Sequence, residues 1–96
     1  MDYNISYIES AKKDVFDIAQ YLSQFYENTF AKFVEQLDRS VGNLAQMPHM
    51  GMIYKNYRRL VVSDYLVFYQ VNEDTRTVQI FRVLHGSQDI RNRLSE

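Results

Sequence analysis

The chain has 96 residues, no cysteine and a formal net charge of −1. This length suits a single domain, residues 1–96, and a hydrophobic content of 46% can fill one modest core, which excludes a wholly disordered chain. Without cysteine there is no disulfide framework and no thiolate metal site. The sequence shows no signal peptide and no apolar run long enough to cross a membrane, so we expect a cytoplasmic protein with no membrane partner.

The charges are unevenly distributed along the chain. Residues 1–50 carry four cations and seven acids, whereas residues 51–96 carry seven cations, six of them arginine, and five acids. Because a guanidinium can bind a carboxylate or a phosphate through two parallel hydrogen bonds, the second half hints at recognition of such groups. Its excess of two cations is too small to indicate a nucleic-acid-binding domain by bulk charge alone.

The first half of the chain is predicted to form a strand and then a helix. Residues 2–8 alternate tyrosine and isoleucine with polar residues, which is typical of a short strand with one buried face. Apolar residues then recur at helical spacing from Val15 to Phe25. We expect Ser10 to be the N-cap of this helix.

A second helix is predicted after the segment YENT, residues 26–29, which breaks the apolar pattern. Asn28 or Thr29 is its expected N-cap, and its apolar stripe runs to Ala45. Two helices joined by so few residues should pack against each other in antiparallel orientation.

The apolar pattern changes from a helical period to alternation after Pro48 and Gly51, which are expected to end the second helix and begin a loop. Three segments rich in Val, Ile, Tyr and Phe are then predicted to be strands: residues 57–62, 64–71 and 77–84. Ser63 and Asp64 suit a tight hairpin turn.

The order β-α-α-β-β-β predicts an α+β fold, in which a helical hairpin packs on one face of a mainly antiparallel four-stranded sheet. A short C-terminal helix or tail follows at residues 89–96. Because two helices cannot cover both faces of the sheet, the second face should be either a functional surface or the seat of another element.

Familiar site motifs are absent from the sequence. The three glycines are isolated, so there is no phosphate-binding loop, and the two histidines do not have the spacing of metal ligands. We therefore expect no metal and no cofactor.

A cluster of cations and tyrosines precedes the central strands. Tyr54, Lys55 and Tyr57 lie next to Arg58 and Arg59 in the sequence, and the two tyrosines are expected to be partly exposed. The two arginines are consecutive in a predicted strand, so they should point to opposite faces of the sheet. This cluster is a candidate surface for binding a partner or a target.

Arg82 lies in the last predicted strand, where alternation places it on one face with Ile80 and Leu84 and places His85 on the other. A buried charge without a partner costs several kcal/mol, about 3–5 when one partner of a buried pair is removed. Asp64 or another acid could neutralise Arg82; alternatively, Arg82 and one of the two preceding arginines could converge on an exposed anion site. His85 could move protons there or simply end the strand.

Four segments together resemble the toxins of RelE/ParE-type toxin–antitoxin modules: ESAKKDVFDIAQYL, LAQMPHMG, YRRLVVSDYLVFYQV and FRVLHGSQDI. They occur in the family's order and spacing, and the resemblance covers nearly the whole chain. It implies a compact toxin that a cognate antitoxin, a protein, holds inactive with an acidic or amphipathic segment that folds on binding.

One branch of this family implies an endoribonuclease that acts on mRNA at the ribosome. That reaction drives a ribose 2′-hydroxyl onto the adjacent phosphate and requires a base, cations and an acid, without a metal. If this reading holds, Arg58, Arg82 and His85 are the candidate catalytic residues. Members of this branch usually carry an arginine just after the aromatic residue of the central strand, where this chain has Leu66.

The ParE-like branch is closer to this chain in the ending RVLH, residues 82–85, followed by Asp89, although Ser87 and Gln88 replace arginines that are common there. This branch implies inhibition of DNA gyrase by binding, without hydrolysis, and we favour it, or binding to an uncharacterised target, over the nuclease. A third reading is a toxin fold that has lost its activity. The residues expected to contact a partner or target are Tyr54, Lys55, Tyr57, Arg58, Arg59, Arg82, His85 and Arg91.

Overall fold

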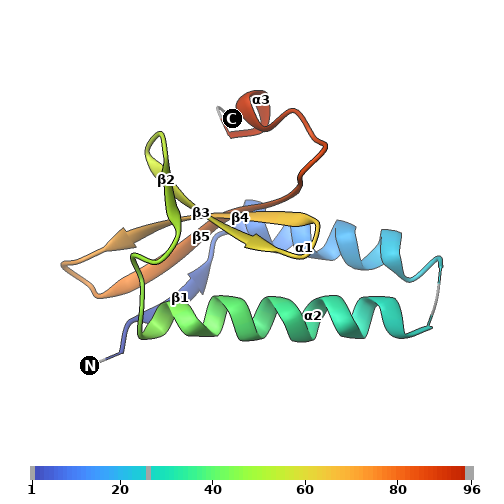
Figure 1. Ribbon diagram of the computed structural model, residues 1–96, viewed down its shortest axis with the longest axis horizontal. Helices are drawn as coiled ribbons and strands as arrows, with labels where there is room; N and C mark the ends of the chain where they lie inside the picture. The colour runs from blue at the N-terminus through green and yellow to red at the C-terminus, as the bar shows by residue number, and fades with distance from the viewer. Residues whose placement is uncertain (1, 26, 95–96) are drawn as a thin grey trace.

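A computed structural model describes residues 2–25 and 27–94 of the protein. Its elements in chain order are β1 (Asn4–Tyr7), α1 (Glu9–Leu22), α2 (Glu27–Gly42), the short 3₁₀ helix η1 (Asn43–Ala45), β2 (Met52–Tyr54), β3 (Tyr57–Val62), β4 (Tyr65–Asn72), β5 (Thr77–His85) and α3 (Ile90–Leu94). Helices α1 and α2 lie side by side on one face of the sheet, and α3 lies on the opposite face (Figure 1). Within the described ranges, no helix has the length and apolar character needed to cross a membrane.

The sheet has five strands in the order β1-β5-β4-β3-β2. β1 pairs in parallel with β5, and every other pair is antiparallel. The predicted α+β class, helical hairpin and mainly antiparallel sheet are confirmed, but the predicted strand count is one too low. The additional strand is β2, which has three residues, two of them, Met52 and Ile53, exposed. So short an exposed segment has no alternation of buried and exposed residues that could reveal it.

The helices begin earlier than predicted. The Ile8 amide donates to the Ile80 carbonyl at 3.0 Å, so the pairing of β1 with β5 continues to the first turn of α1, and Ile8 is the N-cap in place of Ser10. Helix α2 starts at Glu27, which places Asn28 and Thr29 inside its first turn instead of at the cap. Residue 26, the first residue of the predicted break YENT, lies outside the described residues.

The main core lies between the sheet and the pair α1 and α2. Val67 and Tyr69 of β4 and Ile80 of β5 are fully buried and face the helices. From the helices, Ala11 and Leu37 reach this core with almost no exposed area. The main core therefore joins the first half of the chain to the last two strands of the sheet.

A β-bulge at Phe81 changes which residues of β5 face the helices. Phe68 pairs with Arg82 and Tyr69 pairs with Ile80, so Phe81 has no partner across the ladder. After this extra residue the alternation is reversed, and Val83 instead of Leu84 enters the main core with Ile80. The predicted alternation of β5 is therefore correct before the bulge and wrong beyond it.

The second face of the sheet has a core of its own. Phe68, Leu84 and Leu94 of α3 are buried together there. Ile90 of α3 packs against this cluster with Leu66. Another element thus covers part of the second face, and the predicted C-terminal helix is confirmed over residues 90–94, whereas residues 95–96 lie outside the described range.

The loop between η1 and β2 is attached to the sheet by one buried tyrosine. The Tyr69 hydroxyl donates to the Pro48 carbonyl at 2.8 Å and accepts from the Gly51 amide at 2.9 Å. At Gly51 a Cβ atom would lie 2.6 Å from that hydroxyl oxygen and 3.0 Å from the Arg59 carbonyl oxygen. Only glycine allows the loop to approach this closely.

Gly51→Ala should therefore lower the free energy of unfolding by about 1–3 kcal/mol, the usual cost of overpacking. Gly42→Ala is the matched control, because a Cβ there meets nothing within 4 Å and the backbone is helical at φ −58°. The control should be neutral or up to about 1 kcal/mol more stable. Urea denaturation followed by circular dichroism measures both variants, and equal effects would show that the loop does not pack against Tyr69.

Tyr7 should make the protein sensitive to alkaline pH. Burial, assisted by the charge of Asp38, raises the pKa of the Tyr7 hydroxyl to about 12. The unfolded chain therefore loses this proton at lower pH than the folded chain does, so the free energy of unfolding should fall as the pH rises from about 10 to 12. Tyr7→Phe should reduce the slope of that fall by up to about 1.4 kcal/mol per pH unit. Urea titrations at several pH values would measure it, and an unchanged slope would contradict the prediction.

Candidate functional site

The hairpin of β2 and β3 presents cations and an aromatic ring at one end of the sheet. Tyr54 pairs with Tyr57 across a two-residue turn in which Lys55 has a φ of 55°. Lys55 Nζ and Arg59 Cζ each lie 5.9 Å from the centre of the Tyr54 ring. The ring thus lies within cation–π distance of two charges.

Apolar side chains are exposed beside these cations. The exposed fraction is 67% for Met52 and 73% for Ile53, both on strand β2 at the edge of the sheet. No acidic residue occurs in the sequence from residue 39 to residue 63. We call this region the basic edge surface and define it by these residues: Met52, Ile53, Tyr54, Lys55 and Arg59.

Arg59 is only partly satisfied within the basic edge surface. It is half-buried and pairs with Met52 across the two strands, and the contact of its Nη2 atom with the Met52 sulfur is long, at 4.0 Å. Among the buried side-chain nitrogen and oxygen atoms of the described residues, Arg59 Nε has no hydrogen-bond partner. A buried donor without a partner is costly, so this guanidinium retains the capacity to bind an acceptor.

Arg58 points to the other face of the sheet, as the alternation predicted, and it serves the loop. Its Nη1 atom donates to the His49 carbonyl at 3.1 Å and to the Gly51 carbonyl at 2.9 Å. These bonds fasten the same loop that the Tyr69 hydroxyl holds. Arg58 therefore holds the loop through hydrogen bonds, and its side chain lies on the other face of the sheet from that of Arg59.

The loop is also tied to the turn between β4 and β5 by an exposed network. His49 Nε2 lies 2.9 Å from Glu73 Oε1, and the Tyr3 hydroxyl donates to Glu73 Oε2 at 2.7 Å. The hydrogen bond from Tyr3 lowers the pKa of the Glu73 carboxyl and raises that of the Tyr3 hydroxyl. His49 is thus engaged with a carboxylate, and within the described ranges no group of three His, Cys, Asp or Glu side chains is placed to hold a metal ion.

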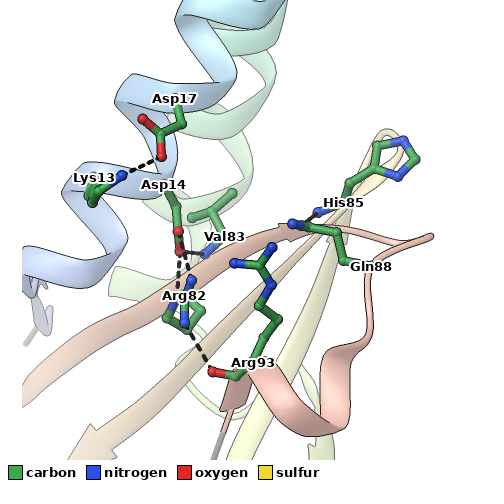
Figure 2. Close-up of polar contacts among 8 residues, drawn as sticks. All are labelled: Lys13, Asp14, Asp17, Arg82, Val83, His85, Gln88 and Arg93. Carbon is green, nitrogen blue, oxygen red and sulfur yellow. Dashed lines mark hydrogen bonds and ion pairs between the residues drawn. The ribbon is translucent and has the colours of Figure 1, made fainter. Parts of the chain in front are cut away.

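Arg82 is held by Asp14 of α1 (Figure 2). Its Nε and Nη2 atoms donate to the two carboxylate oxygens of Asp14 at 2.7 and 3.0 Å, and its Nη1 atom donates to the Arg93 carbonyl of α3 at 3.0 Å. The side chains of Arg82 and Asp14 are only 14% and 13% exposed. The required acid is therefore Asp14 and not Asp64, and Arg82 joins the helix layer to α3 around the edge of β5.

His85 lies at the end of β5, away from the two arginines discussed above. Its ring packs edge-on against Tyr65, with the ring centres 5.3 Å apart, and its Nδ1 atom accepts from the Ser87 amide at 3.1 Å. Figure 2 shows its side chain pointing away from the pair of Asp14 and Arg82. Along β4, Arg58 pairs with Tyr69 but His85 pairs with Tyr65, so Arg58, Arg82 and His85 do not meet in one site.

The remaining predicted contact residues lie on the α3 side of the sheet. Tyr57 is half-buried, with its ring centre 5.4 Å from that of Phe81, and it packs against the small core under α3. Arg91 is exposed on α3. Leu66 also packs against that small core, so the position where the resemblance expects a nuclease arginine belongs to an apolar contact.

Sequence reasoning did not identify Asp14, whose carboxylate accepts three hydrogen bonds from β5. Besides binding Arg82, Asp14 Oδ2 accepts from the Val83 amide at 2.9 Å. In the sequence, Asp14 is an acid near the start of an amphipathic helix, where a carboxylate usually serves the helix dipole. Its partners are 68 and 69 residues away in the sequence, and no local signal indicates them.

The fold of this chain is also found in other solved structures. Solved structures that resemble it include proteins of toxin–antitoxin systems, among them the chromosomal ParDE system from P. aeruginosa (TM-score 0.70, 18% identity, 86% of this chain and 95% of that chain covered). The intact E. coli RelBE complex (0.62, 17%, 90% and 99%) and RelBE2 from Mycobacterium tuberculosis (0.60, 18%, 88% and 99%) are similar. At such identities the likeness establishes the fold alone.

The family follows from the sequence itself. The sequence model of the family described as the ParE toxin of the type II toxin–antitoxin system parDE matches residues 5–90. The chain therefore belongs to the ParE toxin family, and it is a toxin of a type II toxin–antitoxin system. No sequence among the curated proteins matches it.

Asp14→Asn should lower the free energy of unfolding by about 2–4 kcal/mol, because it removes the carboxylate charge that binds the largely buried guanidinium of Arg82. Asp17→Asn, one helical turn later, is the matched control. Asp17 pairs with Lys13 at 2.8 Å, but both side chains are more than half exposed, and such pairs contribute less than about 1 kcal/mol. Chemical denaturation of the two variants measures the difference. Equal stabilities would mean that Arg82 is not held by Asp14 and is available for another role.

Proposed function

We propose that this toxin stops growth by binding a large target in the cytoplasm, with DNA gyrase as the first candidate, and that it cuts no nucleic acid. A cognate antitoxin neutralises it. The observation that carries the proposal is the separation of the groups that a nuclease would need.

Arg82 is the first of these groups. Its guanidinium donates to both carboxylate oxygens of Asp14 and to a backbone carbonyl, at distances of 2.7–3.0 Å. A phosphate would have to displace this partly buried carboxylate, which would cost several kcal/mol, about 3–5 for breaking a buried pair. Arg82 is thus poorly suited to stabilise the developing charge of a phosphoryl transfer.

His85 is the second. It packs against Tyr65 on the face of the sheet that carries α1 and α2. Arg59, whose Nε atom has no hydrogen-bond partner, pairs with Phe68 and lies with it on the other face, which carries α3. General acid–base catalysis requires the base to reach the reacting hydroxyl within about 3 Å, directly or through one water. Groups on opposite faces of a sheet do not meet that requirement at one phosphate.

The basic edge surface supports a binding mode instead. It combines exposed apolar side chains with two cations, Lys55 and Arg59, in a stretch of the sequence without acids, and its Arg59 Nε lacks an acceptor. A surface of this kind suits an acidic partner surface with apolar centres, since apolar contact supplies affinity and charge supplies orientation. We assign the contact with the target to this surface.

A supercoiling assay with purified DNA gyrase, relaxed plasmid DNA and ATP tests the proposal. The toxin should abolish supercoiling in a saturable way. Lys55→Glu should weaken the inhibition at least tenfold, because it reverses a charge of the basic edge surface. Lys32→Glu is the matched control, an exposed lysine on α2, and it should stay within twofold of the wild type.

Two other results would contradict the proposal. Unimpaired supercoiling at saturating toxin, with new 5′ ends inside codons on primer extension of cellular mRNA, would indicate the ribosome-dependent nuclease. Normal growth after induction of a folded chain, with neither effect, would indicate a toxin fold without activity.

A further inference from the structure

An open hollow lies at the turn between β3 and β4, at the other end of β3 from the turn of the basic edge surface. It is an open cleft of about 530 Å³ between the C-terminal half of α1, the turn that follows β3, the start of β4 and the end of β5. Its walls include these six residues: Asp17, Ile18, Tyr21, Asp64, Tyr65 and His85. The hairpin of β2 and β3 contributes nothing to its lining, so the two surfaces are separate.

The cleft is mainly apolar, and an exposed aromatic pair borders it. Ile18 and Tyr65 contribute to the floor, where they also pack against the main core. Tyr21 is 57% exposed on one wall, and its ring stacks edge-on against Phe25, which is 55% exposed, with the ring centres 5.1 Å apart. Two large aromatic side chains exposed together are typical of a protein contact surface.

The charge at the cleft is opposite to that of the basic edge surface. Asp17 lies on the helix wall and Asp64 on the facing turn, and neither lysine nor arginine is among the described lining residues. Two lysines lie beside the lining: Lys13 pairs with Asp17 at 2.8 Å in an exposed contact, and Lys32 lines an adjoining hollow that also includes Asp64. The cleft therefore favours a cation supplied from outside.

We propose that this cleft binds a segment of the antitoxin that presents an arginine or lysine between Asp17 and Asp64 and lays apolar side chains on Ile18 and Tyr21. The proposal rests on the proposed neutralisation by an antitoxin and names the chemistry of that contact. An arginine suits the place best, because its guanidinium can bind a carboxylate in bidentate fashion and stack on the Tyr21 ring. Such an anchor differs from the acidic segment that would suit the basic edge surface.

The chemistry of the cleft is tested without the antitoxin. The full chain, labelled with ¹⁵N, is titrated with the peptide acetyl-Ala-Leu-Arg-Leu-Ala-amide and with the same peptide carrying glutamate in place of arginine. The arginine peptide should shift the amide signals of Ile18, Tyr21 and Tyr65 in a saturable way, and the glutamate peptide should not. Equal shifts with both peptides, or shifts confined to the β2–β3 hairpin, would overturn the proposal.

A charge reversal then localises the contact. Asp64→Lys should weaken binding of the arginine peptide at least tenfold, and Asp74→Lys is the matched control. Asp74 is also an exposed acid in a turn, but it lies beyond the other end of β4. Asp17→Lys, at an exposed helical position, repeats the test if Asp64→Lys does not fold. Unchanged binding in a folded Asp64→Lys or Asp17→Lys chain would overturn the proposal.

Competition identifies the occupant. Unlabelled antitoxin should displace the arginine peptide from the cleft and should bind Asp64→Lys at least tenfold more weakly than Asp74→Lys. If the antitoxin binds the wild-type chain and leaves the peptide in place, the antitoxin is not the occupant and the proposal fails. If no antitoxin binds the wild-type chain at all, the proposed neutralisation fails, whereas the peptide titration still decides whether the cleft accepts a cationic segment.

Discussion

The carboxylate of Asp14 is the contact on which the arrangement of this fold depends. Strand β1 covers the outer edge of β5 only as far as Ile80, so the amides of β5 beyond that point face no strand on that side. Asp14 accepts from the Val83 amide and from two nitrogen atoms of Arg82. One side chain of a helix thus replaces the missing strand, satisfies a backbone donor and neutralises the only charge that β5 carries between Thr77 and Leu84.

The bulge at Phe81 makes this contact possible. It places Phe81 and Arg82 consecutively on the α3 side of the sheet and returns Val83 to the main core. From there Arg82 reaches Asp14 on one layer and the Arg93 carbonyl on the other (Figure 2). The three layers are therefore joined by one ion pair at an edge as well as by two apolar cores. The same contact occupies the guanidinium of Arg82 with a carboxylate.

Much of the fold was predictable because periodicity reports local burial. The amphipathic stripes of α1 and α2 and the alternation of β3 and β4 indicated a helical hairpin on a sheet. What failed was specified by tertiary contacts. β2 is a strand only because Met52 to Tyr54 pair with β3, and Ile8 ends β1 because it bonds to Ile80. The site was less predictable still, because Arg82 and Asp14 lie 68 residues apart in the sequence. The neighbours Arg58 and Arg59 point to opposite faces of the sheet, so that Arg58 binds the loop whereas Arg59 Nε has no hydrogen-bond partner.

The parallel pairing of β1 with β5 has a consequence for when the toxin can exist. Residues 4–7 pair with residues 77–80, so the first strand finds its partner only when most of the chain has been synthesised. Pairing across such a distance closes a long loop before it gains any contacts, which slows folding relative to local structure. When residue 80 is being added, the residues of both helices and of β3 and β4 have been synthesised, but β5, which pairs with both β1 and β4, is still incomplete. The complete sheet, and with it the cleft between α1 and the ends of β4 and β5, therefore forms only after nearly the whole chain has been synthesised.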